Sequence, residues 1–321
     1  MSVIVTGGAG FIGSNIVGAL NAAGREDIII VDNIHTSEKW MNIRDKKFLS
    51  YFHKNEFLDK LWKMDDVTHI IHMGACSSTT ETDFDYLYKN NVEYSKELWN
   101  YAAEQKASFL YASSAATYGN GQDGFDDEKD IQGLKPLNRY GYSKHLFDMW
   151  AEKQDRRPAQ AVGMKFFNVY GPNEYAKGSM ASVVYHGYKQ IIQSGAIRLF
   201  KSYREGIEDG GQKRDFIYVK DICKIIRFLM AHPEVSGLFN IGTGTAETFF
   251  HLAQAIFKAL NLEPDIRFID MPSELHSRYQ YYTKAETNQL LKSGYADPFY
   301  SLEDGVKDYV CEYLAKGFAV N

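Results

Sequence analysis

The 321-residue sequence predicts an α/β fold in which a doubly wound parallel sheet carries a smaller α/β lobe. A short apolar run at 3–6 stops at a cluster of glycines, and apolar residues then recur at helical spacing. A second apolar strand follows at 27–31, and strand-like runs continue to alternate with helix-length stretches. Repeated strand–helix units of this kind build parallel sheets, whose ligands lie at the carboxyl ends of the strands.

The first turn fits a dinucleotide-binding, Rossmann-type pattern. Residues 8–13, GAGFIG, fit GxGxxG, and Gly7, Gly10 and Gly13 equally fit GxxGxxG. Glycines are needed there because the chain turns sharply, a pyrophosphate approaches the backbone, and the new helix packs close to the strand. Asp32 ends the second strand, where an acidic residue can bind a ribose hydroxyl. This context favours a nucleotide site over a simple connecting loop.

The later elements follow from the same patterns. Further strands are expected at 68–73, 108–113 and 161–169, with helices at 83–105 and 139–154. The dinucleotide domain would cover 1–170, with returns to the sheet near 215–242, namely at 215–219 and 238–241. A substrate-binding lobe would interleave with it at 171–214 and 243–321. That lobe would begin with a helix at 178–193 and include 266–269 and the aromatic stretch SRYQYY at 277–282.

Composition excludes several classes of protein. The formal net charge is -5 and no dense run of lysine or arginine is present, so we expect no nucleic-acid partner. Three widely spaced cysteines, Cys76, Cys223 and Cys311, fit reduced thiols, and no His/Cys cluster suggests a metal. Neither a signal peptide nor a membrane-spanning run is recognisable. We therefore expect a cytoplasmic protein with no metal and no membrane partner.

The stretch RYGYSK at 139–144 predicts a catalytic pair. Residues four apart share a helix face, so Lys144 pairs with Tyr140, and Tyr142 packs or lies at the surface. Tyrosine, with an ordinary pKa of about 10, can take a hydroxyl proton only as phenolate, which a neighbouring ammonium favours. An exposed tyrosine beside a snorkelling lysine is the alternative. The glycine turn and the Ser113-Ser114 strand end favour catalysis.

The motifs TGGAGFIG, SSAATYG, YGYSK and FNVYGP resemble the extended, nucleotide-sugar-modifying branch of the short-chain dehydrogenase/reductase superfamily. The strings HMGACSSTTETD, KRDFIYV, SRYQYYT and above all KGSMAS are similar to the ADP-L-glycero-D-manno-heptose 6-epimerases, a family of lipopolysaccharide heptose synthesis. This resemblance implies NADP as cofactor, with NAD left open. It also implies a 6″-keto intermediate, an ADP-heptose substrate and a homo-oligomer, with a pentamer as the state considered.

The resemblance implies a role for individual residues. Tyr140 and Lys177 would serve opposite epimers as acid and base, Lys144 would hold the nicotinamide ribose, and Ser114 would bond the reacting oxygen, although Ser113 is adjacent. Cofactor contacts would be Gly7, Gly10, Phe11, Ile12, Gly13, Asp32, Asn33, Lys39, Lys54, Met73, Gly74, Ala75, Cys76, Ser77, Asn90, Tyr140, Lys144, Val169 and Lys177. Substrate contacts would be Ser114, Asn168, Ser179, His186, Phe200, Lys201, Ser202, Tyr203, Arg214 and Tyr279.

Four features leave alternatives open. Asp32 alone favours NAD, because a carboxylate would repel a 2′-phosphate, whereas Lys39 and Lys54 could compensate. Met73 stands where the family usually has an acidic residue, and the segment 203–214 is longer than usual. By itself, Lys177 would be a phosphate-facing or solvated lysine.

Rival functions can be weighed on single residues. A 4,6-dehydratase would need an acidic pair just after the strand-end serine, where this chain has Ala115-Ala116. A 4-epimerase stays open on the residues alone. A non-catalytic dinucleotide-binding regulator would be expected to have lost Tyr140 or Lys144, and both are present.

Overall fold

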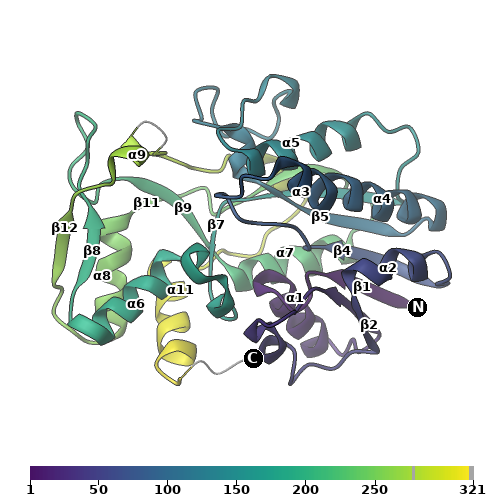
Figure 1. Ribbon diagram of the computed structural model, residues 1–321, viewed down its shortest axis with the longest axis horizontal. Coiled ribbons are helices and arrows are strands. Elements are labelled where there is room, and N and C mark those ends of the chain that lie inside the picture. Colours follow the sequence, from purple (N-terminus) through teal and green to yellow (C-terminus); the bar gives the residue numbers. More distant parts are fainter. Residues whose placement is uncertain (277–278, 318–321) are drawn as a thin grey trace.

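The larger part of the molecule is a seven-stranded parallel sheet with the strand order β10-β6-β5-β4-β1-β2-β3 (Figure 1). The computed structural model describes residues 1–276 and 279–317. Because β1 lies between β2 and β4, the chain reverses its direction of winding beside β1, and ligands of such sheets bind at this point. The strands are β1 (Ser2–Thr6), β2 (Ile28–Asp32), β3 (Ser50–His53), β4 (Val67–His72), β5 (Ser108–Ser114), β6 (Gln160–Phe166) and β10 (Gly237–Ile241).

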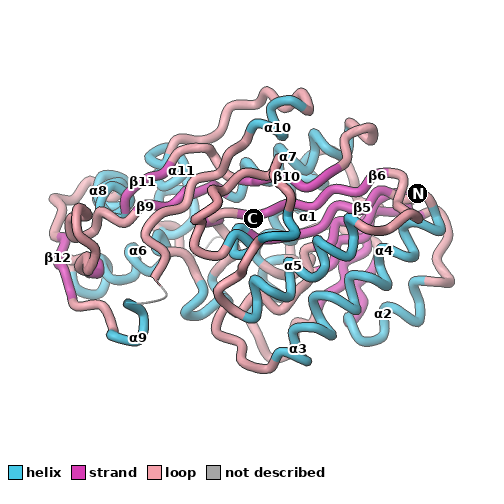
Figure 2. Tube along the Cα trace, turned by 90° about the horizontal axis from the view of Figure 1, so that it is seen from above, coloured by secondary structure: helices cyan, strands magenta, loops and turns pink. Residues whose placement is uncertain are grey.

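Helices cover both faces of this sheet. Alternate residues of β1 point to opposite faces, so Val3 and Val5 join one core cluster and Ile4 joins another. The first cluster is covered by α1 (Phe11–Ala22), α7 (Val219–Ala231) and α10 (Asn288–Lys292). The second is covered by α2 (Lys54–Leu61), α4 (Tyr94–Gln105) and α5 (Arg139–Glu152), with α3 (Phe84–Tyr88) packed beside α5. Figure 2 shows α2 to α5 together on one side of the strands.

A smaller lobe lies beside the sheet, on the left of Figure 1. It has its own core, which is built from aromatic and aliphatic side chains of two small sheets and their helices. The sheets are β11-β9-β7 and β12-β8. The elements are β7 (Asn168–Tyr170), α6 (Val183–Ser194), β8 (Ile197–Phe200), β9 (Lys213–Tyr218), β11 (Ala246–Thr248), α8 (Phe249–Ala259), β12 (Ile266–Ile269), α9 (Ser273–His276) and α11 (Leu302–Tyr309).

The predicted α/β class is confirmed, but four local predictions need correction. The expected return of 215–219 to the main sheet was wrong, since β9 pairs with β7 and β11 in the lobe. The expected strand 161–169 divides at Phe167, after which β7 leaves the main sheet. The expected helix 83–105 is interrupted by a π-helical segment, Lys89–Glu93.

The helix expected at 178–193 begins later, at Val183. Residues 277–278 of the SRYQYY stretch lie outside the described residues.

Candidate active site

The glycine turn joins β1 to α1 where the winding of the sheet reverses. Gly7 has a φ of +65°, and a Cβ on it would lie 2.7 Å from the Gly74 nitrogen. A Cβ on Gly13 would lie 2.2 Å from the Gly7 carbonyl oxygen. Both positions therefore require glycine, and the turn lies directly against the loop that follows β4. Helix α1 has no side-chain cap at Gly10, so its first N–H groups are available to an anion.

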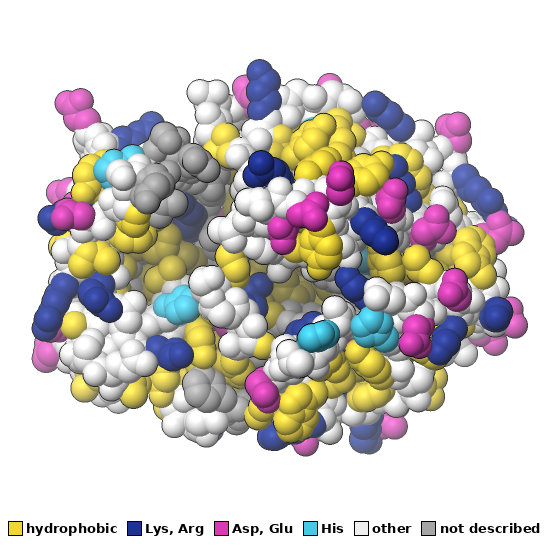
Figure 3. Space-filling view, viewed as in Figure 1, with side chains coloured by type: hydrophobic (Ala, Val, Ile, Leu, Met, Phe, Trp, Pro, Cys, Tyr) yellow, Lys and Arg dark blue, Asp and Glu magenta, His cyan; other side chains and the backbone are white. Residues whose placement is uncertain are grey.

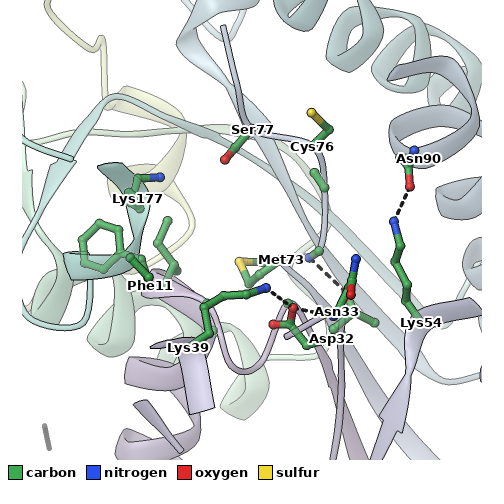
Figure 4. Close-up of a pocket in the computed structure, with 18 of the residues that line it drawn as sticks. Phe11, Asp32, Asn33, Lys39, Lys54, Met73, Cys76, Ser77, Asn90 and Lys177 are labelled. Atoms are coloured by element: carbon green, nitrogen blue, oxygen red, sulfur yellow. Dashed lines mark hydrogen bonds and ion pairs between the residues drawn. The ribbon is translucent and has the colours of Figure 1, made fainter. Parts of the chain in front are cut away.

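Asp32, at the end of β2, binds three groups. Its carboxylate accepts hydrogen bonds from the backbone N–H groups of Ala9, at 2.9 Å, and Asn33, at 2.7 Å. The Lys39 ammonium donates to it at 2.6 Å (Figure 4). The carboxylate that alone would favour NAD is thus neutralised by a lysine at the same place.

A cavity of about 490 Å³ lies over the ends of β1, β2 and β4. Figure 3 shows that this face of the molecule is hollowed between the lobe and the main-sheet part. All the predicted cofactor contacts line the cavity, except Tyr140, Lys144 and Val169. The glycine cradle, the uncapped helix and the neutralised Asp32 fit a dinucleotide.

Two predicted contacts have clear roles in the cavity wall. The Lys54 ammonium donates to the Asn90 side-chain oxygen at 2.6 Å, and burial lowers the pKa of Lys54. Met73 lines the cavity and packs against the main core, so it offers an apolar contact where a carboxylate was expected. Compared with the acidic residue that the resemblance implies at this position, Met73 offers no hydrogen-bond acceptor in its side chain, but it still forms part of the cavity wall.

Tyr140 and Lys144 lie on the buried side of α5, just beyond the cavity. Burial raises the pKa of Tyr140, and a hydrogen bond with Ser114 only partly opposes this. Burial lowers the pKa of Lys144 to about 8, although Asp148 and Cys76 act in the opposite direction, and its amine donates to the Ala112 carbonyl at 2.9 Å. Cys76, which lines the cavity, is thus close enough to act on both groups.

The two strand-end serines have different surroundings. Ser113 is buried and donates to the Asp148 carboxylate at 2.6 Å. Ser114 is near enough to Tyr140 to lower its pKa, in opposition to burial, and its side chain accepts a hydrogen bond from the Ala116 N–H at 3.1 Å. Tyr142 is exposed and stacks on Phe84, with ring centroids 5.6 Å apart, so it takes no part in the pair.

Lys177 lines the cavity and lies on a 3-10 turn (Tyr175–Met180). Its Nζ lies 5.8 Å from the centroid of the Phe11 ring (Figure 4). Burial lowers the pKa of Lys177, while the nearby carboxylate of Glu174 opposes the shift. A lysine whose pKa is lowered toward neutrality is better suited to proton transfer than an exposed one.

Arg214 and two aromatic residues form a second cluster, in the lobe. The guanidinium is almost completely buried and lies 5.5 Å from the ring centroids of both Phe249 and Tyr279. Phe200 packs edge-on against Tyr279, at 6.3 Å. A guanidinium stacked between rings keeps its flat fork fixed, which suits a phosphate oxygen pair.

The other predicted substrate contacts lie on several different elements. Lys201 and the Tyr203 hydroxyl both bind Asp270, at 3.0 and 3.1 Å, and Tyr203 stacks on His276. The Ser202 N–H donates to Asp209. The three remaining contacts lie on β7, the 3-10 turn and α6, respectively: Asn168, Ser179 and His186. Val169 is half-buried between the two main cores.

Several residues in the cavity wall or directly behind it were not predicted from the sequence. Asn91, in the π-helical segment, bonds both backbone groups of Cys76 and donates to Ser143 at 2.9 Å, so it ties the cofactor loop to α5. Asn42 donates to the carbonyls of Ala9 and Asn173. Asn173 has a φ of +72°, a conformation in which asparagine is enriched, and that was its one available signal. The unpredicted lining residues are Thr6, Val31, Asn42, Ser78, Tyr86, Tyr94, Asn173, Ala176 and Met180.

Two further properties concern the part of the chain that the structure describes. It contains no group of three or more His, Cys, Asp or Glu side chains that could hold a metal ion. None of its helices is long and apolar enough to cross a membrane.

Comparison with known proteins gives a consistent result. The NAD dependent epimerase/dehydratase family matches residues 3–242. The ADP-L-glycero-D-manno-heptose-6-epimerase of Fusobacterium nucleatum subsp. nucleatum is 50% identical, over 98% of each chain. The protein of the same name from Nitratidesulfovibrio vulgaris strain DP4 is 51% identical, over 97% of this chain and 98% of its own.

Solved structures agree with the fold. The crystal structure of Helicobacter pylori ADP-L-glycero-D-manno-heptose-6-epimerase has a TM-score of 0.82 at 27% identity, over 97% of this chain and 95% of that one. A UDP-N-acetylglucosamine 4-epimerase from Methanobrevibacter ruminantium M1 reaches the same TM-score at 23% identity, over 98% of both chains, which indicates a shared fold.

Proposed function

The chain belongs to the NAD dependent epimerase/dehydratase family, and we propose that it inverts C6″ of ADP-D-glycero-D-manno-heptose to give ADP-L-glycero-D-manno-heptose. The observation that carries this function is the sequence identity of 50% and 51% with two ADP-L-glycero-D-manno-heptose-6-epimerases over nearly the whole chain. A 4,6-dehydratase is disfavoured because Ala115 and Ala116 offer no acidic group beside Ser114.

We assign NADP as the cofactor within the broader class of nicotinamide dinucleotides. The pairing of Lys39 with Asp32 supports this choice, because the Lys39 ammonium beside the expected ribose position can bind a 2′-phosphate. When bound, the dinucleotide would take a hydride from C6″ and return it to the opposite face, with a 6″-ketone between the two steps. The chain would hold it with the glycine turn, α1 and the lysines of the cavity wall.

Tyr140 and Lys177 would move the hydroxyl proton. The C6″ oxygen points in opposite directions in the two epimers, so one proton-transfer group cannot easily serve both. Tyr140, beside Ser114, would act on one epimer, and Lys177 would act on the other. Because burial keeps Tyr140 protonated in the free protein, ionisation would depend on positive charge near it, which Lys144 supplies below a pH of about 8.

The lobe would bind the nucleotide part of the substrate. Arg214, between Phe249 and Tyr279, would bind the pyrophosphate, and Phe200 would support Tyr279. The homo-oligomer and the cytoplasmic location implied by the resemblance belong to this proposal too. Sedimentation of the purified protein would establish the oligomeric state.

The test is conversion of substrate without added cofactor. We would mix the purified protein with ADP-D-glycero-D-manno-heptose and follow the C6″ configuration by NMR, with a UDP-hexose as the comparison substrate. Formation of the L-glycero epimer that is lost in Tyr140→Phe is the expected result. Inversion of the UDP-hexose alone, or no conversion even after NADP and NAD are supplied, would reject the heptose assignment.

A further inference from the structure

The loop that carries Lys177 has an unusual backbone path. It spans residues 171–182, between β7 and α6, and turns back over the cavity. Gly171, Asn173 and Gly178 have φ values of +143°, +72° and +56°. Three residues with positive φ within eight positions give the loop a backbone conformation that needs stabilising contacts from the rest of the protein.

The side chain of Glu174 supplies that support. It is completely buried, and its carboxylate accepts hydrogen bonds from the Ser182 N–H at 2.5 Å and from the Ser182 hydroxyl at 2.6 Å. The Gly171 N–H, at the other end of the loop, points to it at 3.4 Å. Both ends of the loop therefore meet at the carboxyl group of Glu174.

The same residue fixes the middle of the loop. The backbone carbonyl of Glu174 accepts from the Lys177 N–H at 2.9 Å, which shapes the turn that carries the lysine. Its carboxylate is also close enough to Lys177 to oppose the fall in the pKa of the amine. Tyr309, from α11, faces the carboxylate from the lobe.

The outer side of the loop is fastened to α1. Asn15 donates to the Pro172 carbonyl at 2.9 Å, and Asn173 donates to the Ser14 hydroxyl at 3.0 Å. Phe11, at the start of the same helix, lies beneath the Lys177 amine. The loop is thus held by hydrogen bonds to α1 and by the Glu174 side chain. Several of its residues, among them Lys177, line the cavity.

We propose that Glu174 is a positioning residue for Lys177, whose buried carboxylate closes the 171–182 loop and directs the lysine amine into the active site. This inference rests on the proposed function, in which Lys177 serves one epimer and Tyr140 the other. It predicts that loss of the carboxylate impairs the oxidation of one epimer selectively, because Tyr140 and Ser114 lie on other elements.

The test measures each half of the reaction separately. NADP-loaded protein is mixed rapidly with saturating amounts of either pure epimer, and reduction of the nicotinamide is followed by absorbance. In Glu174→Gln, an amide replaces one accepting oxygen, so the loop should loosen. We expect the rate of nicotinamide reduction by one epimer to fall by at least about tenfold. The rate with the other epimer should stay within about twofold of the unmodified protein, since small displacements of a reacting group have effects of this size.

Lys177→Met identifies the epimer that depends on the lysine. If Lys177→Met is selective and Glu174→Gln slows both epimers equally or neither, the positioning role is rejected and the proposed function stands. If Lys177→Met itself shows no selectivity, the assignment of two proton-transfer groups fails. These outcomes separate the two claims.

Two further variants guard against a general loss of structure. Asp221, on α7, is also completely buried and holds a distant backbone N–H, that of Tyr300, at 3.0 Å. Asp221→Asn should lower the melting temperature without selectivity between the epimers. If Glu174→Gln does not fold, Ser182→Ala removes only one donor to the carboxylate. Ser182→Ala should slow nicotinamide reduction by the same epimer as Lys177→Met does. If Ser182→Ala slows reduction by both epimers to the same degree, or by neither, the inference is overturned.

Discussion

The Lys39 ammonium lies 2.6 Å from the Asp32 carboxylate, at the end of β2 where a dinucleotide ribose is expected to bind. The pair gives a direct test of cofactor choice. Lys39→Met should weaken NADP binding by about tenfold or more, equivalent to about 1.4 kcal/mol, and leave NAD binding unchanged or tighter, because the unpaired carboxylate repels a 2′-phosphate. Titration calorimetry with each cofactor provides the measurement.

Lys47→Met is the control for that variant, since Lys47 pairs with Glu26 on the exposed surface. It should change neither affinity. Equal weakening of NADP and NAD in Lys39→Met would contradict the role of Lys39 in choosing between them.

The pH dependence of activity should report Lys144. Burial lowers the pKa of Lys144 to about 8, so the group is a cation below that pH and neutral above it. Because the reactive form pairs an ionised Tyr140 with a charged Lys144, and Tyr140 loses its proton at a higher pH than Lys144, kcat/KM should rise by about tenfold per pH unit up to about pH 8 and level off above it. A profile that keeps rising to about 10.4, the ordinary pKa of lysine, would contradict this assignment.

Two glycines of the same helix make a matched pair. In Gly13→Ala the new Cβ would lie 2.2 Å from a backbone oxygen, so the glycine turn must shift and dinucleotide binding should be lost. In Gly18→Ala the nearest atoms belong to the flexible side chain of Lys46, at 3.3 Å. That variant should bind the cofactor normally and gain up to about 1 kcal/mol of stability. Calorimetric binding and thermal melting would test both, and normal binding by Gly13→Ala would contradict the cradle.

The stacked position of Arg214 should make it sensitive to a change that keeps the charge. Arg214→Lys loses the flat fork and both ring contacts, so KM for the ADP-sugar should rise by about tenfold or more, with a smaller effect on kcat. Arg267→Lys, at an exposed pair with Asp265, is the control and should leave KM unchanged. An unchanged KM in Arg214→Lys would remove this residue from substrate binding.

The parts of the molecule predicted well are those with local signals. The glycine turn, Asp32 and the Tyr140–Lys144 spacing each lie within a single strand, turn or helix, and the structure places them at one edge of the sheet. Tyr142 could be excluded from the pair because helical spacing alone decides it.

The parts predicted poorly depend on contacts between distant segments. The stretch 213–218 can form a strand in either sheet, and only its pairing with β7 and β11 decides where it lies. Asn91 was missed for a similar reason, since its role comes from contacts with Cys76 and Ser143, which lie far from it in sequence.

The most direct test of the account follows the C6″ hydrogen itself. ADP-D-glycero-D-manno-heptose labelled with deuterium at C6″ is converted in ordinary water, and the label is measured at C6″ of the product by NMR and mass spectrometry. Return of the same hydride to the opposite face predicts full retention of deuterium in the L-glycero product. Loss of the label to solvent would contradict the account, because it would mean that inversion proceeds by removal of a proton from carbon.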